Sequence, residues 1–252
     1  MTLQELFGSI ADAIRTKTGG SEKITPTAFP EKIRSIASEG VAQEFVDSVL
    51  EGTTKNVTNT TAGMLTQSAF RGFGSLVSVE MTKATLIGSY GFSGATSLKT
   101  VNFPEAHTVE DYAFDNCWAL EEVSVPKVRV VGRYGFKLCK GLETIRFETA
   151  VSIGLYAFSG CEKLVKVDLA ALEKLNPGAF SGCKSLSAVI IRDVSGLDAP
   201  PETSAFTGTP IVTGGGYIYV PKAELDRIEN ELGWAGSYEV RAIEDWPEIT
   251  GG

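Results

Sequence analysis

The hydrophobic positions of this chain recur every 22 residues between residues 65 and 189. Four columns share that spacing without an insertion: a phenylalanine, an apolar residue five before it, a leucine six after it and a β-branched residue nine after it. A period this long exceeds any helical or strand period, so each repeat is one supersecondary unit that stacks on its neighbours. The phenylalanine column is Phe70, Phe92, Phe114, Phe136, Phe158 and Phe180.

Each repeat contains a predicted strand that begins at the leucine, as in LKTVNF, LEEVSV, LETIRF and LVKVDL. The β-branched residue and the apolar residue two positions later point to the same side, inward, so successive strands form a parallel sheet at roughly 4.8 Å per turn. The rest of each repeat is too short for a long helix and predicts a brief extended piece and a tight turn. The fold class is therefore a β-rich repeat solenoid, a right-handed leucine-rich stack.

The segments that flank the repeats predict two further parts. In residues 1–40, a capping-box pattern at Thr2 and Glu5 precedes an apolar stripe, which predicts a small helical module. Residues 41–211 form the predicted solenoid. Residues 212–252 form a predicted capping segment with a strand and a short helix, and we expect Trp234 and Tyr238 to cover the last turn.

The strand positions two and four after each leucine should face solvent, because the alternating positions face inward. Unlike the core columns they do not repeat, so they indicate no periodic ligand. Arg146 and Asp168 fall on neighbouring turns and should form a surface ion pair of about 0–1 kcal/mol. This face is our candidate contact surface, and a merely solvated sheet face is the alternative. Its candidate residues are Thr100, Asn102, Glu122, Ser124, Thr144, Arg146, Lys166 and Asp168, and the next repeat places Ala188 and Ile190 at the same positions.

Charge and hydropathy exclude several partners. The 252-residue chain has a formal net charge of −8 and no basic stripe, which argues against nucleic acid and against an anionic membrane. No run of eighteen apolar residues predicts a membrane span. The first twenty residues lack the features of a secretion signal, so we expect a soluble chain and leave its location open.

Two further columns invite a chemical interpretation. Cys117, Cys139, Cys161 and Cys183 each follow a repeat phenylalanine by three residues. Zinc sites usually have cysteines in closely spaced pairs, whereas these four are one repeat apart. Their Cα–Cβ bonds should be parallel, which is unfavourable for a disulfide. We therefore expect the cysteine side chains to pack in the core. A tyrosine column two before each phenylalanine, from Tyr90 to Tyr156, could stack on sugar rings or pack on the return face with its hydroxyls in water.

Catalytic constellations are missing from the sequence. The one histidine, His107, falls in a connection, and Glu121 and Glu143 should lie on an exposed edge without a cleft. No nucleophile elbow, zinc-helix motif or phosphate loop is present. We therefore expect no enzyme activity, no cofactor and no metal.

The quoted columns carry a resemblance to a known family. The units DYAFDNCWALEEVSVP and LYAFSGCEKLVKVDL resemble the BspA-type bacterial leucine-rich repeat, over about residues 60–210. The head, ADAIRTKTGGSEKITPTAFPEKIRSI, resembles a module of phage and prophage structural proteins. The two resemblances imply a non-enzymatic protein, either a virion component of the tail or fibre type or a bacterial cell-surface adhesin. The implied partner is a protein or a cell-surface glycan, and a homo-oligomer is possible.

Overall fold

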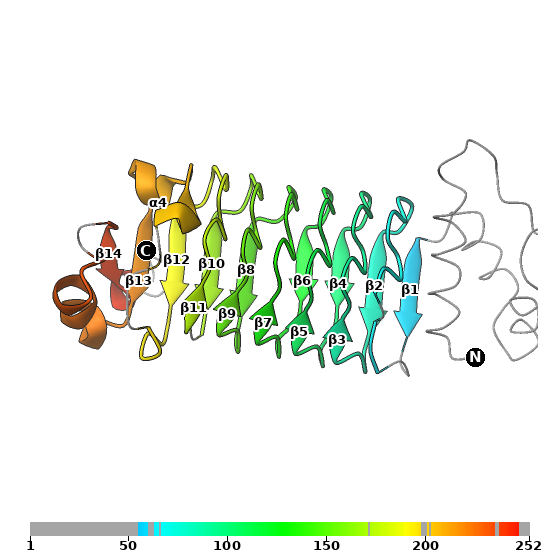
Figure 1. Cartoon of the computed structure of the whole chain (residues 1–252), viewed down its shortest axis with the longest axis horizontal. Coiled ribbons are helices and arrows are strands. Elements are labelled where there is room, and N and C mark those ends of the chain that lie inside the picture. Colours follow the sequence, from blue (N-terminus) through cyan, green and yellow to red (C-terminus); the bar gives the residue numbers. More distant parts are fainter. Residues whose placement is uncertain are drawn as a thin grey trace, which may run out of the picture.

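The computed structural model describes residues 55–59, 63–65, 67–170, 172–197, 201, 203–234 and 237–246. They form an elongated solenoid whose turns lie side by side from β1 to β14 (Figure 1). The helical module expected in residues 1–40 lies outside these ranges, so the division of the chain into three parts stays a prediction. No helix within the described ranges is long and apolar enough to cross a membrane.

The strands that follow the repeat leucines are parallel and pair in the predicted register. Val101 lies between Val79 of the preceding turn and Val123 of the following one. Residues 22 apart are therefore spatial neighbours, which confirms the predicted solenoid. These strands are β1 (Asn56–Asn59), β2 (Ser78–Met81), β4 (Thr100–Asn102), β6 (Glu122–Ser124), β8 (Thr144–Phe147), β10 (Lys166–Leu169) and β12 (Ala188–Ile191).

This sheet is not continuous along the whole stack. A four-stranded sheet ends at β6, a five-stranded sheet begins at β8, and no strand pairing joins them. Val123 of β6 is only half-buried, whereas Val101 and Ile145 on either side of it are buried. The sequence predicted one unbroken sheet, because the repeat has the same length on both sides of the interruption.

The return side of each turn holds a second parallel sheet of two-residue strands, which corresponds to the predicted extended pieces. Its order is uninterrupted, and Leu65 adds an isolated bridge to Ile87 at one end. The strands are β3 (Leu86–Ile87), β5 (Thr108–Val109), β7 (Val130–Val131), β9 (Ser152–Ile153) and β11 (Lys174–Leu175).

The phenylalanine column forms the axis of the core. Neighbouring rings from Phe70 to Phe206 are stacked with centroids 4.9–5.6 Å apart and are nearly parallel. These separations are within the range of favourable aromatic pairs, and the 22-residue repeat brings the rings together. Burial of each ring contributes about 1.5–3 kcal/mol, and no single turn could provide that burial alone.

The tight turn around each phenylalanine from Phe70 to Phe180 contains two residues in the left-handed region. In the turn of Phe114 these are Tyr112 (φ 59°) and Asn116 (φ 61°). The backbone N–H groups of Tyr112, Phe114 and Asn116 then donate to carbonyls of the next turn, at 2.8, 2.7 and 2.8 Å. The two left-handed residues thus point these N–H groups along the solenoid axis. The resulting hydrogen bonds join neighbouring turns where no strand is present.

The end of the stack is covered by residues that break the 22-residue period. Tyr238 contacts Phe206 edge to face at 5.6 Å, and its hydroxyl donates to the carbonyl of Pro201 at 2.6 Å. Trp234 is fully buried, so both residues cover the last turn as expected. The elements here are η2 (Thr203–Phe206), α4 (Pro210–Thr213), β13 (Tyr217–Val220), η3 (Lys222–Glu224), η4 (Arg227–Glu231), β14 (Val240–Ala242) and η6 (Ile243–Asp245).

Candidate binding face

The outer face of the long strands is the candidate contact surface, and its exposure varies along the stack. Thr100 and Asn102 on β4 are half-buried, while Glu122 and Ser124 on β6 are exposed. On β8, Thr144 and Arg146 are exposed as well. Lys166 on β10 is half-buried, but Asp168 is only 8% exposed, so the prediction that it faces solvent is wrong.

A groove of about 530 Å³ runs across β1, β2, β4 and β6 on this face. It contains four of the predicted contact residues, and Val79, Val101 and Val123 contribute to its lining. The structure thus brings half of the predicted residues into one concavity. The polar residues that line it are Thr58, Ser78, Glu80, Thr100, Asn102, Glu122 and Ser124.

A smaller concavity of about 270 Å³ lies farther along the face, beside β8 and β10. Of the predicted contact residues it holds Arg146 and Asp168. Thr144 and Lys166 line neither of these two concavities. The other residues of this second concavity are Phe147, Glu148, Ala170 and Arg192.

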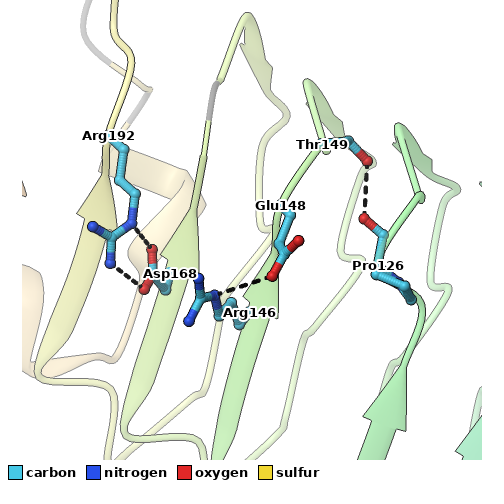
Figure 2. A network of polar contacts seen from close by, with 6 residues as sticks. All are labelled: Pro126, Arg146, Glu148, Thr149, Asp168 and Arg192. Atoms are coloured by element: carbon cyan, nitrogen blue, oxygen red, sulfur yellow. Dashed lines mark hydrogen bonds and ion pairs between the residues drawn. The ribbon is translucent and has the colours of Figure 1, made fainter.

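The predicted ion pair between Arg146 and Asp168 is wrong, although the two residues do lie on neighbouring strands. Asp168 accepts two hydrogen bonds from Arg192, from Nε at 2.8 Å and Nη2 at 2.7 Å. Arg146 instead approaches Glu148 on its own turn, at 3.6 Å (Figure 2). The bidentate contact is the stronger arrangement, and the hydrogen bonds that Arg192 donates to Asp168 raise the pKa of Arg192.

Arg192 was not among the predicted contact residues because it lies just after β12, outside the alternating strand positions. The sequence indicates this contact only through an arginine that follows a strand aspartate by 24 residues. Since the repeat is 22 residues long, that spacing does not predict that the two side chains meet. Its side chain reaches back to the preceding turn, and that direction depends on the tertiary structure.

The face is closed at one end by an aromatic cluster that the sequence did not predict. Ala188 and Ile190 were expected to face solvent, but each is only 1% exposed. Ile190 pairs in register with Tyr219, 29 residues later, and Tyr219 packs against Trp246 with centroids 4.8 Å apart. The cap therefore covers this part of the face.

Cations flank that aromatic cluster. The guanidinium of Arg241 lies 3.4 Å from the ring centroid of Tyr217, and Nζ of Lys166 lies 5.6 Å from that of Trp246. Both distances are within the range of cation–π attraction. Arg241 thus covers one face of Tyr217 and helps to fix the end of the binding face.

The cysteine column is part of the core, as expected. All four cysteines are unpaired and buried. Each Sγ lies 3.0–3.2 Å from the carbonyl oxygen of a phenylalanine one turn back, as Cys139 does from Phe114. Burial raises the pKa of Cys117, Cys139 and Cys161, which keeps these thiols protonated and inert.

The tyrosine column cannot offer ring faces to a sugar. The four rings from Tyr90 to Tyr156 stack on one another with centroids 4.7–5.4 Å apart. The guanidinium of Arg71 lies 4.9 Å from the ring of Tyr90 at one end. At the other end Tyr156 lies against Gly178. Since neighbours take up the ring faces, the packing interpretation is the better one.

The residues considered for catalysis do not converge. His107 is exposed, and Glu121 is paired with Lys99 of the preceding turn at 3.6 Å. Glu143 is also exposed. Within the described ranges, no group of three or more His, Cys, Asp or Glu side chains could hold a metal ion.

Solved structures with a similar fold come from bacteria. A leucine-rich repeat protein from Bacteroides ovatus is similar with a TM-score of 0.51 and 22% identity, over 67% of this chain and 52% of that one. The Treponema pallidum leucine-rich repeat protein is similar with a TM-score of 0.53 and 23% identity, over 76% of this chain and 87% of that one. The match thus spans about half of the Bacteroides protein, and at these identities both likenesses show the fold alone.

No curated protein matches the sequence. The family model for the BspA-type leucine-rich repeat region, in contrast, matches in six copies over residues 63–187 and 107–209. These ranges together include more than half of the chain and the whole phenylalanine column from Phe70 to Phe206. The chain therefore belongs to the family of BspA-type leucine-rich repeat proteins.

Proposed function

We propose that this protein is a non-enzymatic binding protein that recognises a protein partner through the outer face of its long strands, in the manner of a bacterial surface adhesin. The observation that supports this most is the groove across β1, β2, β4 and β6. It is open and spans several turns, as an extended protein contact requires. Its lining is mixed polar and apolar, which is typical of protein interfaces.

The rest of the surface supports the same choice of face. The cysteine column is inside the core, and the tyrosine rings cover one another. The aromatic cap closes one end of the strand face and leaves the groove open. A solenoid of this kind holds its outward side chains at fixed spacing, so a contact surface is built without loop ordering on binding.

The virion interpretation depends on the head segment, which lies outside the described residues, and the family match does not extend to it. The adhesin-like function depends only on the solenoid. We therefore prefer it, and a glycan partner becomes one outcome of the test.

The test uses arrays of extracellular-matrix proteins, bacterial cell-wall fragments and glycans, probed with the full chain. Each hit is then measured with two matched double variants. Thr100→Arg with Ser124→Arg places bulk on the proposed face, whereas Thr108→Arg with Ser152→Arg places the same bulk on the return strands β5 and β9. Circular dichroism checks that both variants are folded.

We expect the first variant to lose at least about tenfold in affinity for a protein hit, and the second to bind as the unmodified chain does. Equal losses in the two variants would contradict a role for the strand face. Hits confined to glycans would replace the protein partner by a carbohydrate, and an absence of any hit would argue against the binding function.

A further inference from the structure

Several acidic side chains of the solenoid are neutralised by a basic side chain on their own or an adjacent turn. Examples are Glu105 with Lys127 at 2.7 Å and Asp168 with Arg192 at 2.7 Å. Glu162 likewise contacts two lysines. Neutralisation across turns is favoured because side chains 22 residues apart are held close together.

Two carboxylates in the strand-face groove are not neutralised in this way, and among the described residues the same is true of others, such as Glu110 and Glu143. Neither Glu80 nor Glu122 has an ion-pair partner among the residues that the structure describes. Glu80 accepts one hydrogen bond, from Nδ2 of Asn102 at 3.2 Å. No lysine, arginine or histidine lines the groove. It therefore presents two negative charges that nothing in the lining balances.

The chemistry of the lining favours a polypeptide over a carbohydrate. The remaining polar groups are the hydroxyls of Thr58, Ser78, Thr100 and Ser124 and the amide of Asn102, all able to donate and accept hydrogen bonds. No aromatic ring lines the groove, so the usual stacking surface for a sugar is missing there. The exposed part of the aromatic cluster lies at the other end of the face, beyond β12.

We infer that the groove binds an extended, positively charged segment of a partner polypeptide, with Glu80 and Glu122 as the charge-recognition residues. This inference rests on the proposed function and specifies the partner for the same face. Glu80 pairs in register with Asn102, Asn102 pairs with Ser124 on the next strand, and Thr100 pairs with Glu122. The two carboxylates therefore lie diagonally across two turns, roughly 12 Å apart by the turn spacing and the rise per residue.

That separation sets the spacing of the cations. An extended chain advances roughly 3.4 Å per residue, so basic residues three or four positions apart reach both carboxylates. Lysine and arginine can each donate several hydrogen bonds to a carboxylate, and the hydroxyls beside them can bind the backbone of the segment.

The test measures fluorescence anisotropy with labelled synthetic peptides and the full chain. The probes are a peptide of repeating Lys-Ser-Ser units, its Gln-Ser-Ser and Glu-Ser-Ser counterparts, and a neutral oligosaccharide. The protein variants are Glu80→Gln with Glu122→Gln and, as a matched control, Glu231→Gln with Glu239→Gln in the cap, where both side chains are exposed. Each pair removes two negative charges from a chain of net charge −8.

We expect the lysine peptide alone to bind. The groove variant should weaken that binding about tenfold, the cap variant less than twofold, and high salt should weaken it in the unmodified chain. Equal weakening in both variants would show attraction by net charge only and overturn the inference. Failure of the lysine peptide to bind, or binding of the oligosaccharide that the groove variant leaves unchanged, would overturn it as well.

Failure of this inference and failure of the proposed function give different results. Suppose that a protein hit is lost with the Thr100→Arg, Ser124→Arg variant but binds the Glu80→Gln, Glu122→Gln variant unchanged. That result would support the binding face and contradict the charged groove. Loss with both variants supports both proposals. Binding of the lysine peptide without any array hit would support the groove chemistry and reject the adhesin-like function as tested.

Discussion

The ring of Tyr156 occupies the space in which a side chain at residue 178 would begin. Gly178 has φ 67°, and the tyrosines at the same position in earlier turns have left-handed φ values as well. A Cβ on Gly178 would lie 2.9 Å from Cζ of Tyr156 and closer still to other ring atoms. The tyrosine column thus ends against a glycine that has both the required backbone conformation and no side chain.

Replacement of Gly178 by alanine should therefore destabilise the solenoid by at least about 2 kcal/mol. The left-handed conformation disfavours alanine by about 1–2 kcal/mol, and Tyr156 must move. Urea unfolding followed by circular dichroism measures the change. Gly74→Ala is the control, because a Cβ there meets only Oγ1 of Thr96 at 3.7 Å, and we expect a change within about 0.5 kcal/mol. Similar effects of the two substitutions would contradict this account.

Leu138 adopts φ 59°, at a position where other turns have glycine or asparagine, such as Gly160 and Asn116. We expect Leu138→Gly to be more stable than Leu138→Ala by about 1 kcal/mol, the reverse of the order in a helix. Both variants lose the leucine side chain and differ only in the Cβ, so their difference isolates the backbone preference. An alanine variant as stable as the glycine variant in urea would show that the position is not strained.

Removal of Arg192 should leave the carboxylate of Asp168 without its cation. The side chain of Asp168 is 11% exposed, so we expect Arg192→Ala to lower the free energy of unfolding by about 1–3 kcal/mol. The matched variant is Arg146→Ala, since that side chain is 68% exposed and lies 3.6 Å from Glu148. It should change stability by less than about 0.5 kcal/mol. Thermal unfolding measures both variants against the unmodified chain. Equal decreases in Tm would argue against the importance of the bidentate contact.

The buried thiols should make the protein less stable at alkaline pH. Burial raises the pKa of Cys117 and Cys139 in the folded chain, while in the unfolded chain both titrate near their ordinary value of roughly 8.5. Below that value both states are protonated. Above it only the unfolded state loses protons, so stability falls by about 1.4 kcal/mol per thiol for each further pH unit.

The comparison is between the unmodified chain and the Cys117→Ala, Cys139→Ala double variant, by urea unfolding at neutral pH and near pH 10. Alanine occurs naturally at this position as Ala95, which is fully buried. The double variant should lose less stability than the unmodified chain between the two pH values, whatever its stability at neutral pH. Parallel losses would mean that these thiols do not titrate differently in the two states.

The repeat register and the core could be predicted from sequence because they depend on local spacing. The columns of Phe92 and Val101 recur without insertion, and stacking then places equivalent residues side by side. The alternation along each strand likewise predicted that Thr100 and Glu122 face outward, and both line the groove.

The candidate site was only partly predictable. Which of the outward residues share a concavity depends on where the sheet is interrupted, between β6 and β8, and the repeat length does not change there. Arg192 and Tyr219 were missed because each meets its partner at a separation that is not a multiple of the repeat, 24 residues from Asp168 and 29 from Ile190.

By itself, the sequence determined the period, the parallel register, the buried phenylalanine and cysteine columns and the membership of the repeat family. Those properties follow from hydrophobic burial between identical units, which needs no knowledge of distant contacts. Only the tertiary structure decided that Asp168 pairs with Arg192, that the cap covers Ile190, and that Glu80 and Glu122 share a groove without a cation. Each of these depends on the direction of a side chain or on the path of a non-repeating segment, and repeat spacing specifies neither.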